Sequence, residues 1–149
     1  MKIIIDTNIV FSAILNSNSR IGKILLNAKE HFQSFTCSYL KVELQGHRNR
    51  LLKITKLTEE ELSELEELVT QHITFIDERL IPQDLLIRIE AQLKSIDPGD
   101  TVFTALTKHL EGKLWTGDMQ LYNGLKAKRF RNVILTSELS LLLNDLERD

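Results

Sequence analysis

Four acidic residues of this sequence stand where a predicted strand ends or a predicted helix begins, and their oxygen atoms could bind a metal ion. Asp6 follows a short apolar strand, and Glu43 lies early in a helix. Asp100 opens another helix, and Asp118 comes just after a further strand. Neighbouring carboxylates oppose one another's ionisation, so a group of them is costly without a cation. Carboxylate sites of this kind suit hard cations such as Mg²⁺ or Mn²⁺.

The elements that must position these acids alternate between strand and helix. The run Ile3-Ile4-Ile5 is β-branched and has no polar alternation, which predicts a strand covered on both faces, as in a parallel sheet. Further strands are predicted at about residues 33–38, 72–76, 113–116 and 132–135. Strands separated by helices pair in parallel through crossover connections. We therefore predict a single α/β domain over residues 1–149.

Apolar spacing and capping residues predict the helices. Ser19 is a predicted N-cap, and Thr58 with Glu61 forms a predicted capping box. Pro82 is expected at a helix start and Gly112 at a helix end. The predicted helices cover about residues 9–14, 19–28, 39–54, 58–69, 82–93, 100–110, 118 onward and 137 onward. The two helices on either side of Thr58 are expected to form a hairpin.

A parallel sheet would bring most of the acids to one place. The carboxyl ends of parallel strands share an edge, and ligands of such sheets bind beyond it, so Asp6, Asp118 and the start of the helix carrying Glu43 should lie together. The helix of Asp100 leads back into the fourth strand from the other end, so its position depends on the crossing angle. Taken singly, each acid can also be a helix cap, a turn residue or a solvated helix residue.

Composition limits the class of protein. A net charge of −2 and a pI near 6.1 argue against nucleic-acid binding through the overall field. Two local basic stretches, at residues 47–56 and 126–131, could still contact a phosphate backbone, although solvated helix faces explain them as well. The single cysteine, Cys37, excludes an intrachain disulfide. No apolar run approaches the roughly 18 residues of a membrane span, so we expect no membrane segment and a cytoplasmic protein.

Four segments resemble, in order, the signature segments of PIN domains. They are Ile3-Ile4-Ile5-Asp6-Thr7-Asn8, Leu40-Lys41-Val42-Glu43-Leu44, Asp97-Pro98-Gly99-Asp100-Thr101-Val102-Phe103-Thr104-Ala105-Leu106 and Leu114-Trp115-Thr116-Gly117-Asp118-Met119-Gln120-Leu121. The resemblance implies a three-layer α/β/α domain with a central parallel sheet of about five strands. It also implies a metal-dependent ribonuclease, often the toxin of a toxin–antitoxin pair, so RNA, a cognate antitoxin and a homodimeric partner are the partners it suggests.

The same resemblance assigns site residues. The metal site that it implies, for Mg²⁺ or Mn²⁺, consists of Asp6, Glu43, Asp100 and Asp118. It adds Asn8 and Thr116 as polar neighbours of the ligands, and Asp97 as an extra acid. Gly99 departs from the pattern, because similar sequences often carry another acid there.

Other chemistries fit the sequence less well. It has no glycine-rich phosphate loop, and Asp6-Thr7-Asn8 lacks the second acid of aspartyl-phosphate phosphatases. The histidines share no zinc-ligand spacing. Metal-assisted hydrolysis of a phosphodiester needs no dedicated histidine base. The main alternative is a non-catalytic PIN-like module that binds RNA or a protein.

Overall fold

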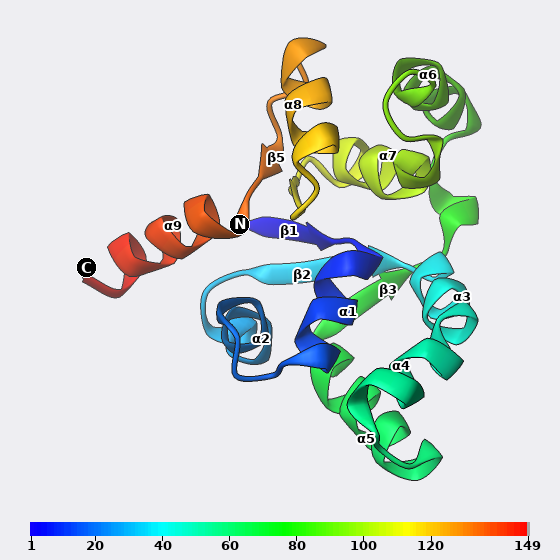
Figure 1. The fold of residues 1–149 in the computed structure, drawn as a ribbon. Helices are drawn as coiled ribbons and strands as arrows, with labels where there is room; N and C mark the ends of the chain where they lie inside the picture. The colour runs from blue at the N-terminus through cyan, green and yellow to red at the C-terminus, as the bar shows by residue number, and fades with distance from the viewer. Residues whose placement is uncertain (149) are drawn as a thin grey trace.

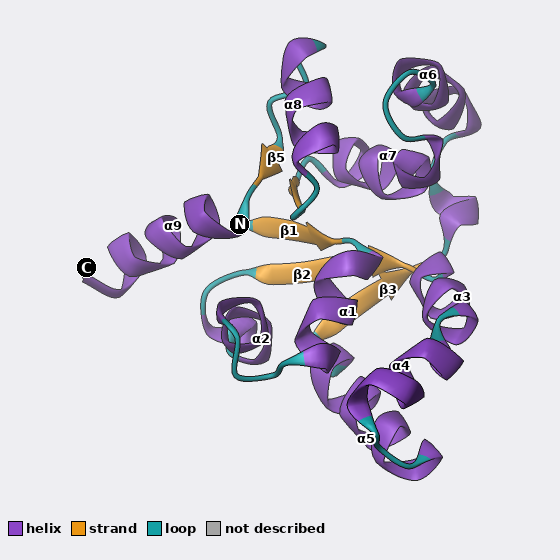
Figure 2. Cartoon of the chain, in the orientation of Figure 1, coloured by secondary structure: helices purple, strands orange, loops and turns teal. Residues whose placement is uncertain are grey.

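A five-stranded parallel sheet forms the centre of residues 1–148, which are the residues that the computed structural model describes (Figures 1 and 2). The strands are β1 (Lys2–Ile5), β2 (Gln33–Cys37), β3 (Ile73–Ile76), β4 (Lys113–Trp115) and β5 (Val133–Ile134). They lie in the order β3-β2-β1-β4-β5. All pairs are parallel, and Ile3, Ile4 and Ile5 of the central strand are fully buried. The predicted parallel sheet and its buried first strand are therefore confirmed.

Helices cover both faces of the sheet. They are α1 (Thr7–Leu15), α2 (Arg20–Leu26), α3 (Tyr39–Gly46), α4 (Arg48–Thr55), α5 (Glu59–Thr70), α6 (Gln83–Leu93), α7 (Thr101–Leu110), α8 (Met119–Ala127) and α9 (Thr136–Arg148), with short 3-10 turns η1 (Ala28–Glu30), η2 (Glu78–Leu80) and η3 (Pro98–Asp100). Connections from β1 to β3 move one way across the sheet, whereas those from β3 to β5 move the other way. Because crossovers are right-handed, α1–α5 cover one face and α6–α8 the other (Figure 1). The expected three-layer architecture is thus confirmed.

The strand order creates a switch point between β1 and β4. The chain leaves β1 towards β2 and leaves β4 towards β5, in opposite directions. The register pairs Ile5 with Trp115, so the next residues along, Asp6 and Thr116, stand side by side at the carboxyl edge. Ligands of open parallel sheets bind at such a point.

Several local predictions are confirmed. The Ser19 hydroxyl accepts a hydrogen bond from the Gly22 N–H at 3.1 Å, and Thr58 forms a complete capping box with Glu61. Pro82 immediately precedes α6.

No helix within residues 1–148 is both long and apolar enough to cross a membrane.

The predicted single helix over residues 39–54 is wrong, because the chain breaks at His47 into α3 and α4. The His47 ring packs edge-on against Phe11 of α1, with ring centroids 5.7 Å apart. The break lets Arg48 reach α5, where its guanidinium pairs with Glu59 at 2.7 Å and Glu66 at 3.3 Å. Contacts with other helices, which local periodicity does not encode, therefore decide where this helix ends.

The predicted role of Gly112 as the helix stop is also wrong. Glu111 takes the left-handed conformation that ends α7, with φ of 56°. A Cβ atom at Gly112 would lie 2.9 Å from the Lys2 carbonyl oxygen and would collide with the Ile4 side chain. Glycine is thus required there by the close approach of β1.

Candidate metal centre

Asp6 lies at the end of the central strand and is almost completely buried, with 2% of its surface exposed. Its Oδ1 accepts a hydrogen bond from the Ile9 N–H at 3.1 Å, so it caps α1. Burial, with smaller effects from the charges of Asp118 and Glu43, raises the pKa of Asp6 to about 6. Hydrogen bonds from Ile9 and Thr116 oppose it. Asp6 can therefore cap α1 and also belong to an acidic site.

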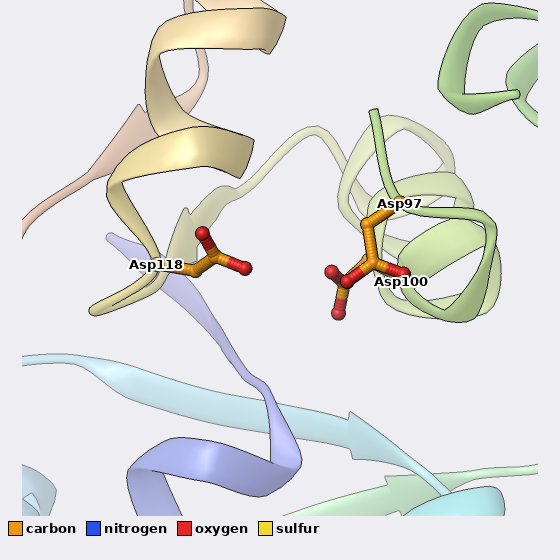
Figure 3. Close-up of side chains that lie close together, drawn as sticks. All are labelled: Asp97, Asp100 and Asp118. Carbon is orange, nitrogen blue, oxygen red and sulfur yellow. The ribbon is translucent and has the colours of Figure 1, made fainter. Parts of the chain in front are cut away.

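Asp97, Asp100 and Asp118 form the tightest acidic group within residues 1–148. Each contributes a carboxylate oxygen, and these three atoms all lie within 4.8 Å of one another. Figure 3 shows Asp118, at the start of α8, facing the other two, which come from the junction of α6 and α7. Asp118 Oδ1 accepts hydrogen bonds from the N–H groups of Gln120 and Leu121 at 2.9 and 3.1 Å. Helix capping thereby fixes the orientation of this carboxylate.

The electrostatics of this group of carboxylates favour the binding of a positive ion. Burial, together with the neighbouring charges of Asp6, Asp97 and Asp118, raises the pKa of Asp100 to about 8. Among the described residues, none of the main causes of the shift of Asp6 or Asp100 is a cationic side chain. An uncompensated set of oxygen donors is the environment that a divalent cation such as Mg²⁺ or Mn²⁺ stabilises, so the residues present fit a metal ion.

Glu43 of α3 lies near Asp6 but outside the group of three aspartates, and its side chain is held by a residue that the sequence analysis missed. The Thr7 hydroxyl, in the first turn of α1, donates a hydrogen bond to Glu43 Oε1 at 2.6 Å. The charge of Glu43 in turn raises the pKa of Asp6. The only sequence signal for Thr7 was its place beside Asp6, because its partner lies 36 residues away.

The two predicted polar neighbours differ in their contacts. The Thr116 hydroxyl accepts a hydrogen bond from the Asp118 N–H at 3.0 Å, and its side chain also hydrogen-bonds Asp6. Thr116 therefore links the ends of β1 and β4. Asn8 is exposed, and its side chain forms no hydrogen bond within the described part of the chain, so its place as a polar neighbour of the ligands stays a prediction.

The approach of α8 to the turn before η3 depends on Gly124. A Cβ atom there would lie 2.7–3.0 Å from the side chain of Ile96, the residue before Asp97. We expect Gly124→Ala to displace Ile96, separate Asp97 from Asp118 and weaken Mn²⁺ binding about tenfold, in the range of changes to outer-shell partners. Calorimetric titration with Mn²⁺ measures this effect.

The matched control for this substitution is Gly46→Ala, because a Cβ atom at Gly46 meets nothing within 4 Å. It should bind Mn²⁺ as the unmodified protein does. Equal Mn²⁺ affinity in the two alanine variants would contradict the prediction and would mean that Ile96 absorbs the methyl group without moving Asp97.

The fold and the site together define an α/β protein whose carboxylates gather at the switch point of a parallel sheet. The chain belongs to the PIN domain family, because the sequence profile of that family matches residues 4–138. The resemblance seen in the sequence is thereby confirmed.

A solved structure has the same fold. It is the crystal structure of VapBC2 from Rickettsia felis bound to a DNA fragment from their promoter, with a TM-score of 0.65 and 18% sequence identity. The match covers 91% of this chain and 97% of the other. No curated protein matches this sequence.

Proposed function

We propose that this protein is a metal-dependent endoribonuclease that hydrolyses RNA phosphodiester bonds with Mg²⁺ or Mn²⁺. The observation that carries the proposal is the convergence of Asp97, Asp100 and Asp118 within 4.8 Å, next to the buried Asp6 and without a compensating cation. Membership of the PIN domain family supports it. A divalent cation bound by these oxygens supplies a water-derived nucleophile and stabilises charge on the phosphoryl oxygens.

In this proposal the chain holds the ligands in fixed orientations. Asp118 is oriented by the first N–H groups of α8, and Asp6 by α1 and Thr116. Thr7 fixes the rotamer of Glu43. Asp6, Asp100 and Asp118 are the proposed direct ligands. Glu43 binds directly or through water and orients the nucleophile, and Asp97 enters the ligand set because its carboxylate lies with those of Asp100 and Asp118.

The nuclease proposal is tested by incubating the purified protein with single-stranded RNA oligonucleotides. We expect cleavage in millimolar Mg²⁺ or Mn²⁺, no cleavage in excess EDTA, and recovery when the metal ion is restored, because four to five carboxylates are ineffective on a phosphodiester without a cation. Cleavage that persists in EDTA would contradict metal dependence. Metal binding without cleavage would favour the non-catalytic binding module instead.

The partner of the proposed nuclease is a separate question. The solved neighbour is a VapBC2 assembly on promoter DNA. By that likeness we propose that this chain is the toxin of a toxin–antitoxin pair, and that a small protein encoded beside it binds and inhibits it. Co-expression with the product of the neighbouring reading frame should relieve growth inhibition, and growth inhibition unchanged by that product would contradict the pairing.

A further inference from the structure

A small cleft on the α6–α8 face is lined by four cationic side chains and is called the basic cleft below. They are Arg88 of α6, Lys108 of α7, and Lys128 and Arg129 in the loop after α8. The volume of the basic cleft is about 100 Å³, and no acidic residue lines it within the described part of the chain. Buried apolar side chains, including Leu85 and Ile89, complete its wall.

The charges of the basic cleft are not neutralised by the protein. Within residues 1–148, none of its four cations forms an ion pair with a carboxylate. The Lys128 ammonium does donate to the Gln92 carbonyl oxygen and, at 3.2 Å, to the Ser95 hydroxyl, but both acceptors are uncharged. Like charges that gather without counter-charges repel one another and attract an anion. The basic cleft is therefore suited to an anionic ligand.

The basic cleft lies on the same side of the sheet as the acidic group. Lys108 follows Asp100 by eight residues, which is roughly 12 Å along α7 at 1.5 Å per residue. Lys128 follows Asp118 by ten residues, which is roughly 15 Å along α8. Its contact with Ser95 also brings it to the segment that leads into Asp97. A strand of nucleic acid spans this separation with a few nucleotides.

The basic cleft combines part of one basic stretch of the sequence with residues of other elements. Residues 126–131 begin at the far end of α8 from Asp118, where Arg88 and Lys108 join them. In the first stretch, Arg48 is occupied by its ion pairs with Glu59 and Glu66. The topology therefore assembles a basic site that neither stretch indicated alone.

We infer that the basic cleft binds a backbone phosphate of the RNA substrate, a few nucleotides away from the bond held at the acidic group. The inference rests on the proposed function in taking RNA as the ligand. Guanidinium groups bind phosphate through paired hydrogen bonds, and lysines add point charge. A cleft of about 100 Å³ leaves room for a phosphate group between these side chains. Such a contact positions the strand without reading its sequence.

The test measures RNA binding without cleavage. A labelled single-stranded RNA oligonucleotide is titrated, in EDTA, with the full chain carrying Asp118→Asn, and fluorescence anisotropy gives the affinity at several salt concentrations. Adding Arg88→Glu and Lys108→Glu should lower the affinity at least about tenfold. Loss of the one phosphate held by the cleft should also reduce the salt slope by roughly 0.7. Both side chains are exposed, so the fold should persist, which circular dichroism checks.

The matched control makes the same charge change elsewhere, with Arg20→Glu on α2 and Lys29→Glu on η1, both of which are exposed. It should retain the affinity of the Asp118→Asn parent. Equal losses in the two double variants, or no loss in either, would overturn the inference. A cleft variant that keeps its RNA affinity but loses binding of labelled polyglutamate would overturn it in favour of an acidic protein partner. If the protein binds RNA through the basic cleft but cleaves no RNA under any condition, the proposed nuclease function would be refuted. The inference that the cleft binds an RNA phosphate would still hold.

Discussion

Asp118→Asn is expected to reduce metal-dependent RNA cleavage more than about 100-fold while leaving the protein folded. Changes to outer-shell partners of metal ions already cost about 10–100-fold, and this substitution removes a charge from the centre of the acidic group. Asparagine keeps the Oδ1 acceptor that caps α8 through the N–H groups of Gln120 and Leu121. The loss should therefore be one of metal binding and catalysis, with no loss of structure.

Initial rates of oligonucleotide cleavage, measured with saturating Mn²⁺, test this expectation. The matched control is Asp84→Asn, an exposed acid in the first turn of α6 that should retain full activity. Asp118→Asn activity within about tenfold of the unmodified protein would place the cation elsewhere. Cleavage by the variant that is also indifferent to EDTA would identify a contaminating nuclease.

The metal-free protein is expected to lose stability as the pH rises from about 4 to about 8, and divalent cations should restore it. The folded pKa values of Asp6 and Asp100, about 6 and about 8, lie above the ordinary value of 3.8. Between the unfolded and folded pKa values the folded state binds more protons, so the free energy of unfolding decreases with pH. The contribution is favourable at low pH and is lost as the pH rises through the folded values.

The expected size of this effect follows mainly from Asp6, which is almost fully buried. A shift of about two pKa units corresponds to on the order of 2–3 kcal/mol. Asp100 is more exposed, so solvent screening makes its contribution smaller. For a chain of this size a loss of 2–3 kcal/mol lowers the melting temperature by about 4–12 °C.

Thermal denaturation in EDTA across this pH range measures the effect, with and without Mn²⁺. Asp100→Asn removes one of the opposed charges, so it should melt at a higher temperature than the unmodified protein at about pH 8. It should also show a smaller increase on addition of Mn²⁺. Asp84→Asn again serves as the control. Stability that increases with pH in EDTA would contradict the expectation, because it would mean that the acids already have a compensating positive charge.

Local patterns in the sequence determined most of the fold. The apolar β-branched run of Ile3 to Ile5 specifies a strand buried on both faces, and its burial is complete in the structure. The caps at Ser19 and Thr58 begin helices as predicted, since a cap acts through hydrogen bonds to residues two or three positions away. Alternation of strand and helix then restricts the sheet to parallel pairing. Each of these signals is contained within a few consecutive residues or in the order of elements.

The sequence also determined that Asp6 and Asp118 would lie at the same edge of the sheet. Both follow adjacent strands of one parallel sheet, and the register of β1 with β4 sets them at the same edge. Their roles as metal ligands stay a prediction until a variant is measured. The PIN domain profile matches residues 4–138, which include both of them.

Only the tertiary structure decided which side chains from separate helices come together. Asp97 joins Asp100 and Asp118 because α6, α7 and α8 pack so that the turn before α7 leans over the sheet edge, helped by the missing side chain of Gly124. Thr7 meets Glu43 for the same kind of reason. Helical periodicity records which face of a helix is buried, but the angle and offset at which two helices pack depend on all the side chains between them. The packing of the helices therefore determines the acidic group and the basic cleft. The local sequence alone determines the strand that ends in Asp6.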